Sequence, residues 1–295
     1  MVSYERSKME RVPKFLLTLV MISAAGTMAA RPAQVMDTKL EAMTLEAYSR
    51  YFQATDARVK KELARPGAFL YLDGLPSPRR LQILQQLKQG EIFMDRLETL
   101  DASGHRIDIP DGLIHHWIGA VFIPRASLKQ AIELAQDYNH HQDIYQPEIV
   151  RSKLLSHNGN DFKIFYRVRK HKVITVTLDT EHEVRYFPVN ATRWYDRSAS
   201  TRIAEVENAG QPDEREKPVG HDAGFLWRIN SWWRWEELDG GVYIECESVS
   251  LTRNIPTGLG WIIKPFVTSI PKESLQDTLG STRSALLQVA MARKR

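Results

Sequence analysis

Residues 225–252 have the sequence FLWRINSWWRWEELDGGVYIECESVSLT, and the fold follows from this segment. Apolar residues alternate with polar ones on both sides of Asp239-Gly240-Gly241, a pattern that predicts two strands, 225–238 and 242–252, joined by a tight hairpin. Strands joined by so short a turn must pair antiparallel, because a parallel pair needs a crossover of a dozen or more residues.

The segments before this hairpin extend the same pattern. Their alternation predicts strands, most of them joined by short links, at 148–156, 162–170, 173–186 and 192–206. The exception is a loop over 207–223, where five charged residues stand between Pro212 and Pro218. We expect this loop to be solvated and mobile, and a role as a lid is an alternative interpretation.

Helical spacing of apolar residues dominates the two ends of the chain. It predicts helices over 38–64 and 77–90, strands over 91–100 and 113–123, and a helix opened by Pro124. A long helix, kinked at Pro265 and Pro271, is expected from Ile262 to Leu286. A single sheet must bury one face. The sequence therefore predicts an α+β fold, a curved antiparallel sheet of about seven strands around a long C-terminal helix, preceded by a helical segment over 31–100.

The first thirty residues have the three-part pattern of a secretory signal. A basic leader precedes an uncharged run from Phe15 to Ala30, and Thr27-Met28-Ala29 is the expected cleavage box. We expect export to the periplasm or the medium. An uncleaved membrane anchor is the alternative, because this run is slightly short of the ~20 residues that span a bilayer.

Composition excludes several classes of protein. One cysteine, Cys246, rules out an intrachain disulfide framework and a multi-cysteine zinc site. The formal net charge is +4 and both signs are scattered, so no nucleic-acid partner is expected. No HExxH motif and no Gly-x-Ser-x-Gly elbow occur, and the cluster of His140, His141 and Asp143 is interpreted as a solvated loop. We therefore expect no metal, no cofactor and no nucleophilic catalyst.

Two segments resemble a known family. Residues 121–147, VFIPRASLKQAIELAQDYNHHQDIYQP, are similar to the first strand and the first two helices of the START-like helix-grip superfamily (SRPBCC; polyketide cyclase/dehydrase and coenzyme Q-binding type). Residues 240–247, leading through Gly258-Leu259-Gly260-Trp261 to Ser274-Leu275, resemble its last strand and closing helix. The resemblance covers about 106–292, so we assign 101–295 to this domain. It implies a cavity between sheet and helix, in a superfamily of lipid carriers, hormone receptors and a few enzymes.

Side-chain alternation indicates which residues face that helix. Four tryptophans lie within the nine residues 227–235, more than a thin sheet face needs. A pocket lined by aromatic rings with few polar groups is typical of hydrophobic ligands. His182 offers one hydrogen-bonding group to a ligand head, and Arg202 is the best cation because it shares a side with Asp196 and Ser198. The expected ligand-binding residues are Tyr166, His182, Arg202, Trp227, Trp233, Trp235 and Phe266.

Three functions fit these observations. The first is an exported protein that binds a lipid or other hydrophobic small molecule, with transient membrane contact as a further option. The second is a cyclase/dehydrase-type enzyme in which His182 or an inward carboxylate acts as the general base. The third is a non-catalytic envelope scaffold whose N-terminal helices bind an unknown protein partner.

Overall fold

A computed structural model describes residues 36–172, 174–255, 264 and 269–292. The expected signal peptide over 1–30 and the candidate ligand residue Phe266 lie outside these residues. The described residues all belong to one compact unit, Val35–Arg295. Apart from two-residue strands, two α-helices come first along the chain, then two strands, two short helices, a run of strands and a final helix, in the order that the sequence indicates.

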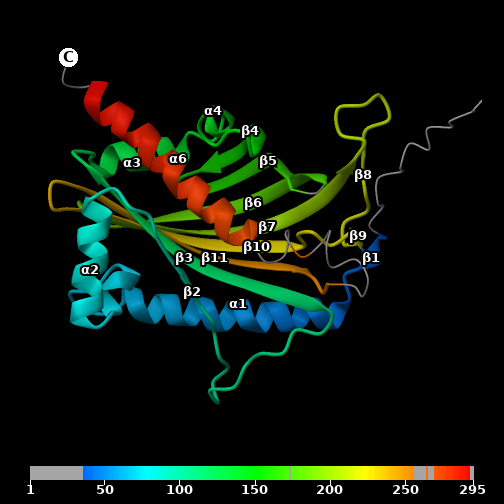
Figure 1. Cartoon of the computed structure of the whole chain (residues 1–295), viewed down its shortest axis with the longest axis horizontal. Coiled ribbons are helices and arrows are strands. Elements are labelled where there is room, and N and C mark those ends of the chain that lie inside the picture. Colours follow the sequence, from blue (N-terminus) through cyan, green and yellow to red (C-terminus); the bar gives the residue numbers. More distant parts are fainter. Residues whose placement is uncertain (1–35, 173, 256–263, 265–268, 293–295) are drawn as a thin grey trace, which may run out of the picture. The chain divides into compact units, whose positions relative to one another are not determined.

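The main sheet holds nine antiparallel strands within the described residues (Figure 1). Eight follow the spatial order β2-β3-β11-β10-β7-β6-β5-β4, and β8 pairs with β7 beside this path. Their bounds are β2 Phe93–Arg96, β3 Gly112–Pro124, β4 Ile149–Asn158, β5 Asp161–His171, β6 Thr175–Asn190, β7 Arg193–Glu207, β8 Arg215–Glu216, β10 Arg228–Leu238 and β11 Gly241–Arg253. A separate pair joins β1 Thr38–Lys39 to β9 His221–Asp222. The seven long strands all lie at predicted strands, and the eighth predicted strand, 91–100, forms only the short β2.

The hairpin between β10 and β11 is as tight as expected. Leu238 pairs with Gly241, which leaves two turn residues between the strands. Those residues, Asp239 and Gly240, have φ values of 57° and 75°. A two-residue turn with both φ values positive matches the right-handed twist of the flanking strands, so it fixes the register of the whole hairpin.

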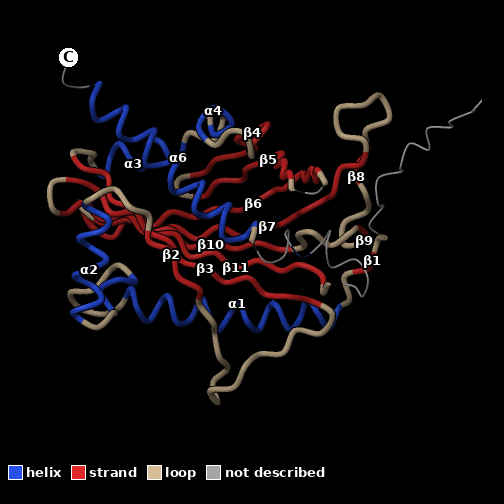
Figure 2. The backbone as a smooth tube through the Cα atoms, viewed as in Figure 1, coloured by secondary structure: helices blue, strands red, loops and turns tan. Residues whose placement is uncertain are grey.

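Three helices lie on the concave face of the sheet (Figures 1 and 2). They are α3 Leu128–Gln136, α4 His141–Ile144 and α6 Ile270–Ala292, and α6 packs mainly against β3 and β11. Leu275, Leu279 and Leu286 supply its buried stripe. The long C-terminal helix therefore covers the inner face of the sheet, as the sequence predicts.

The opposite face carries the N-terminal helices α1 Ala42–Leu63 and α2 Ser77–Lys88, linked through the short η1 Tyr71–Gly74. Val249 and Leu251 of β11 pack there against Tyr48 and Tyr51 of α1. Beneath these helices, buried Arg234 forms an ion pair with Glu62 and donates a hydrogen bond to the carbonyl oxygen of Phe69. The N-terminal helices are thus part of the folded core around the sheet.

The helix that follows β3 begins later than the sequence indicates. Pro124 is the last residue of β3 and does not open the helix, because it still pairs with Gly241. The helix α3 begins at Leu128, where the Ser127 side chain accepts a hydrogen bond from the backbone N–H of Gln130 and the Gln130 side chain reaches back to Ser127. This capping box places the start of the helix.

The charged loop over 207–223 is solvated as expected, and ion pairs attach it to the sheet. Arg167 of β5 binds Glu214, and Arg202 of β7 binds Glu216. Lys217 binds Asp37 and Glu205. These ion pairs and the short strand β8 fasten the loop to the sheet.

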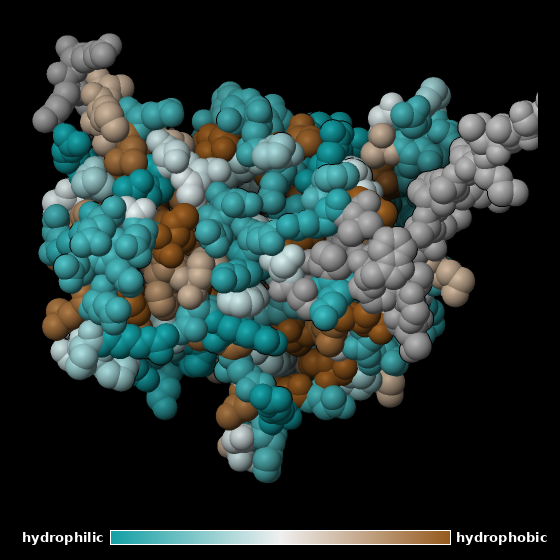
Figure 3. Space-filling model, viewed as in Figure 1, coloured by the Kyte–Doolittle hydropathy of each residue, from teal (hydrophilic) through white to brown (hydrophobic). Residues whose placement is uncertain are grey.

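On the face shown in Figure 3 the surface is mostly hydrophilic, with apolar side chains in separate patches. None of the helices in the described ranges has both the length and the apolar character needed to cross a bilayer.

Candidate functional site

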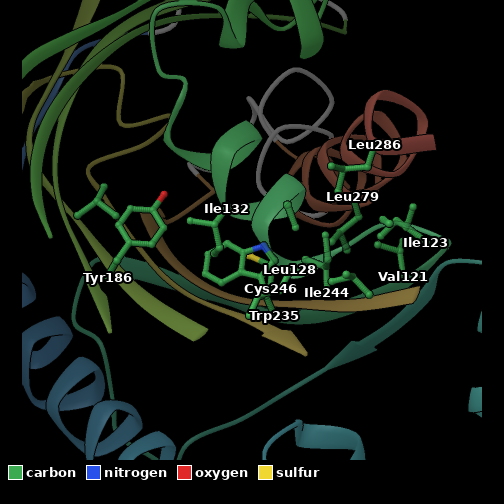
Figure 4. Packing of buried hydrophobic residues seen from close by; sticks show 14 of the residues in the cluster. Val121, Ile123, Leu128, Ile132, Tyr186, Trp235, Ile244, Cys246, Leu279 and Leu286 are labelled. Carbon is green, nitrogen blue, oxygen red and sulfur yellow. The ribbon is translucent and has the colours of Figure 1, made fainter. Parts of the chain in front are cut away.

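A cavity of about 330 Å³ lies between the concave face of the sheet and the helices α3 and α6. Most of its wall is aliphatic or aromatic. Figure 4 shows the packed end of this layer, where Tyr186, Trp235 and Cys246 lie on the side of the sheet that faces α6. The apolar lining includes Trp117, Leu134, Tyr138, Ile164, Tyr166, Leu178, Tyr186, Ile229, Trp233, Trp235 and Leu275.

The alternation of the strands explains which side chains form the floor. Even-numbered residues of β5, β6 and β11 and odd-numbered residues of β10 line the cavity, as the sequence predicts for β5, β6 and β10. In the paired register, Trp233 lies between Asp196 of β7 and Cys246 of β11. One row of side chains therefore runs across the three central strands.

Two tyrosines at one end of the cavity are joined by their hydroxyl groups. The Tyr138 and Tyr186 oxygens are 2.7 Å apart, and the Tyr186 hydroxyl donates to the carbonyl oxygen of Ala135 at 3.1 Å. Because the Tyr186 hydroxyl donates its proton to the Ala135 carbonyl, Tyr138 must be the donor in the hydrogen bond between the two hydroxyls. Burial is the main cause that raises the pKa of both phenols, so both stay neutral.

His141 is buried in the cavity wall and is not the solvated loop residue that the sequence analysis expected. Its Nε2 lies 3.2 Å from the carbonyl oxygen of Leu134, and its Nδ1 lies 2.7 Å from the Tyr166 hydroxyl. A carbonyl can only accept, so Nε2 carries the proton and Tyr166 donates to Nδ1. Neighbouring His140 is exposed and pairs with Asp137. Because both histidines belong to the same polar stretch of sequence, the sequence alone does not distinguish the buried ring from the exposed one.

His141 makes the stability of the protein depend on pH. Burial lowers its pKa to about 4, against 6.5 for a free histidine. The folded state therefore disfavours the charged ring. The contribution of neutral His141 to the free energy of unfolding is fully present above pH 6.5 and is lost as the pH falls toward 4. We expect His141→Gln to remove on the order of 3 kcal/mol of this acid-induced loss.

Urea unfolding at pH 7 and pH 4.5 measures this effect. Wild type and the exposed control His140→Gln are expected to lose similar amounts of stability between the two pH values, and His141→Gln distinctly less. An equal loss in all three proteins would contradict a buried neutral His141.

His182 faces the cavity from the middle of β6, as predicted. Its Nε2 is 3.0 Å from the Thr180 hydroxyl, and that hydroxyl donates to the carbonyl oxygen of Tyr166. Nε2 must therefore donate, which leaves Nδ1 as an acceptor. Burial lowers the pKa of His182 to about 4, so the ring is neutral near pH 7.

Asp196 lies at the floor of the cavity, whereas strand alternation predicts only that it shares a side with Arg202. It is 3% exposed, and its Oδ1 has no hydrogen-bond partner. Burial is the main cause that raises the pKa of this carboxyl well above its ordinary value. Ser198, Ser231 and Ser248 lie in the next row across the sheet and also face the cavity.

Lys170 is the one lysine or arginine among the described residues that line this cavity. It forms an ion pair with Glu148, and burial lowers its pKa to about 8. Lys170 lies opposite Val176 and Asp196 lies opposite Tyr186, at the two ends of the β6 face. Lys170 and Asp196 therefore do not form an ion pair.

Four of the seven predicted ligand residues line the cavity together: Tyr166, His182, Trp233 and Trp235. Trp227 does not, although it has the expected odd number. Regular β10 begins at Arg228, so the alternation does not reach Trp227, which packs on the α1 side and donates from Nε1 to Asp222 at 2.9 Å.

Arg202 also lies away from the cavity. Glu181 pairs with Arg202 and His182 pairs with Ser200, so Thr201 is an extra residue in β7. Such a bulge moves every later side chain to the other face of the sheet. Arg202 therefore points outward to Glu216, while Asp196 and Ser198, before the bulge, face inward.

Within the described ranges, no group of three or more His, Cys, Asp or Glu side chains is arranged to hold a metal ion. His115 and His116 point to opposite faces, toward Thr252 and Glu247, as adjacent strand residues must. Cys246 is buried with a free thiol, and burial raises its pKa well above the ordinary range. A protonated buried thiol is a poor nucleophile.

No family model and no curated protein matches the chain. Among solved structures, it is similar to a STAR-related lipid transfer protein from Xanthomonas axonopodis, with 15% identity, 65% of this chain and 98% of that chain covered, and a TM-score of 0.42. Human STARD10 gives 8% identity, coverage of 79% and 89%, and a TM-score of 0.42. The Zhui aromatase/cyclase from Streptomyces sp. R1128 is 14% identical, with 62% of this chain and 97% of that chain covered and a TM-score of 0.39.

The fold is assigned from the chain's own topology. Seven long antiparallel strands curve around α6, and two short helices, α3 and α4, stand between the first and second of these strands. The chain has the START-like helix-grip fold that the sequence resemblance implied, with a largely apolar cavity between its sheet and its closing helix.

Proposed function

We propose that this protein binds a lipid or another hydrophobic small molecule between the sheet and α6. The cavity of about 330 Å³ carries the proposal. Sites for small molecules are concave, mostly apolar, about 300–1,000 Å³ in volume, and hold a few placed polar groups. This cavity has that volume and lining, with His182 and Asp196 among its few polar groups.

Small side chains on the floor are the reason that this space is not filled. Ser231 lies between Ser198 and Ser248 on neighbouring strands, where a packed core would place large apolar residues. Beside them, Trp235 and Ile244 belong with Leu279 to a closely packed cluster. Large side chains thus fill one end of the layer between the sheet and α6, and small side chains leave the cavity at the other end.

We further propose that the protein is exported, so that it carries its ligand outside the cytoplasm. The basic leader, the apolar run and the small residues up to Ala30 support this proposal. Intact mass measurement of the protein recovered from its producing cells tests it. We expect the loss of residues 1–29, and a full-length mass would contradict cleavage.

Quenching of tryptophan fluorescence by 1-bromodecane tests ligand binding. Bromine quenches indoles that it contacts, so we expect saturable quenching of wild type that decane does not produce. The chain offers a matched pair of variants, because Trp233 lines the cavity and adjacent Trp232 stacks on Phe52 of α1 at 5.5 Å on the other face.

Trp233→Phe is expected to remove a large share of the quenching, and Trp232→Phe to leave it unchanged. A lack of saturable quenching in wild type, or an equal effect of the two variants, would contradict ligand binding in this cavity.

An enzyme of the cyclase/dehydrase type is the second candidate, favoured by the position of His182. The neutral ring faces the cavity and keeps Nδ1 free to accept a proton. However, its hydrogen-bonding partner is the Thr180 hydroxyl, and the burial that lowers its pKa to about 4 makes it a weak base. An efficient general base has a pKa near the working pH. Ligand binding therefore remains the function that this geometry supports best.

A further inference from the structure

A short polar strip crosses the apolar floor of the cavity. Asp196 lies beside Trp233, and the next row along the strands is formed by Ser198, Ser231 and Ser248, which are direct neighbours in the register. Within the described part of the chain, none of the three serine hydroxyls has a hydrogen-bond partner. The strip thus offers unused polar groups in the wall of an otherwise largely apolar cavity.

Among the described residues, Asp196 is the buried acid of the cavity wall that lacks a cation. Asp222 and Glu245 also lack an ion pair within these residues, but each accepts two hydrogen bonds: Asp222 from the Gly224 N–H and Trp227 Nε1, and Glu245 from the N–H groups of Tyr71 and Leu72. Asp179 is bound by Arg167, Glu236 by Arg193, and Glu247 by His116 and Arg58. Within the described residues Asp196 has no ion pair; its carboxyl accepts one hydrogen bond, from the backbone N–H of Trp233, and its Oδ1 has no hydrogen-bond partner. A buried carboxyl without a cation is stable as the neutral acid, and a neutral acid is a hydrogen-bond donor as well as an acceptor.

The nearby tyrosines cannot replace this donor. The Tyr138 hydroxyl donates to Tyr186, and the Tyr186 hydroxyl donates to the Ala135 carbonyl. The Tyr166 hydroxyl donates to His141. Among the described side chains at this end of the cavity, the unused donors are therefore Asp196 and the serine hydroxyls. They form one patch, because they lie on three adjacent strands.

We propose that Asp196, Ser198, Ser231 and Ser248 recognise a neutral oxygen, such as that of a ketone, ester or alcohol, at one end of the hydrophobic ligand. This inference rests on the proposed binding function and names the chemical class of the ligand. A carboxylate of the same chain length is disfavoured there, because an anion in this apolar wall needs a cation, and Lys170 lies at the far end, paired with Glu148.

Three probes of equal chain length test the proposal: decan-2-one, decane and decanoate. Each competes with 1-bromodecane for the cavity at pH 7. We expect wild type to bind decan-2-one roughly fivefold to tenfold more tightly than decane, the effect of about one hydrogen bond, and decanoate most weakly.

Asp196→Leu is expected to abolish the preference for the ketone and to keep the binding of decane. Asp196→Asn keeps a neutral donor and is expected to keep the preference. The control Asp161→Leu removes an exposed carboxylate paired with Arg185 and is expected to change nothing. If Asp196→Leu does not fold, the double variant Ser231→Ala with Ser248→Ala replaces it, and we expect about a fivefold loss of ketone affinity.

The possible failures are distinguishable. Wild-type protein that binds none of the three probes overturns the proposed function and this inference with it. Equal affinity for all three probes, or an unchanged ketone preference in Asp196→Leu, overturns the inference alone and leaves the hydrophobic cavity as a binding site without a polar end.

Discussion

Replacement of Ser231 by phenylalanine is expected to weaken the binding of 1-bromodecane by roughly fivefold to a hundredfold without unfolding the protein. Ser231 lies at the centre of the floor, between Ser198 and Ser248, and its side chain points into the cavity. A phenyl ring there occupies the space of the ligand. Forcing both into one site costs about 1–3 kcal/mol, which is up to a hundredfold in affinity.

The fold should tolerate this ring. Phenylalanine is favoured in strands, and filling a cavity with apolar atoms buries surface instead of creating a void. The matched control is Ser156→Phe on an exposed position of β4, which adds the same ring outside the cavity. We expect it to bind 1-bromodecane like wild type. Wild-type affinity in Ser231→Phe would show that the ligand does not occupy this cavity.

Replacement of Arg234 by methionine is expected to lower the free energy of unfolding by about 3–5 kcal/mol. Arg234 is 2% exposed, and its guanidinium lies 2.7 Å from the Glu62 carboxylate of α1. Methionine keeps much of the volume but leaves half-buried Glu62 with Arg58 as its one remaining cation among the described residues, and it removes the hydrogen bond to the buried Phe69 carbonyl. Breaking one half of a buried ion pair costs far more than replacing both halves with apolar residues.

The double variant Arg234→Met with Glu62→Leu separates these effects. We expect it to recover most of the lost stability in urea unfolding, because it leaves no unpaired charge from this pair. A loss below about 1 kcal/mol in the single variant would mean that this pair contributes no more than a surface ion pair.

The strands and their order were predictable because alternation and turn chemistry are local properties. Asp239-Gly240 alone specifies a two-residue turn, and the even positions of β5 and β6 and the odd positions of β10 identified the cavity face. His182, Tyr166, Trp233 and Trp235 were found in this way. The position of α6 follows from burial, because a single sheet must bury one face, and the resemblance implies the same position.

The errors arose where one residue breaks the alternation. The extra residue Thr201 moves Arg202 to the outer face, and nothing in the sequence around it marks a bulge. Trp227 precedes the regular part of β10 and packs against the other side of the sheet. A period of two predicts faces only while the strand stays regular.

The most informative polar residues could not be chosen from the sequence for a different reason. Asp196 was recognised as a neighbour of Arg202 on one face, but its isolation depends on which cation each other acid finds across the sheet. His141 is the first residue of α4 and directly follows exposed His140, and its burial depends on contacts with Tyr166 and Leu134. Both facts belong to tertiary packing.

The most direct test of the central claim is a crystal structure of the protein grown with 1-bromodecane, with the bromine located by its anomalous scattering. We expect the bromine peak inside the cavity, between Trp233 of the sheet and Leu275 of α6. A space filled by side chains, or a bromine bound only outside it, would contradict a ligand-binding cavity.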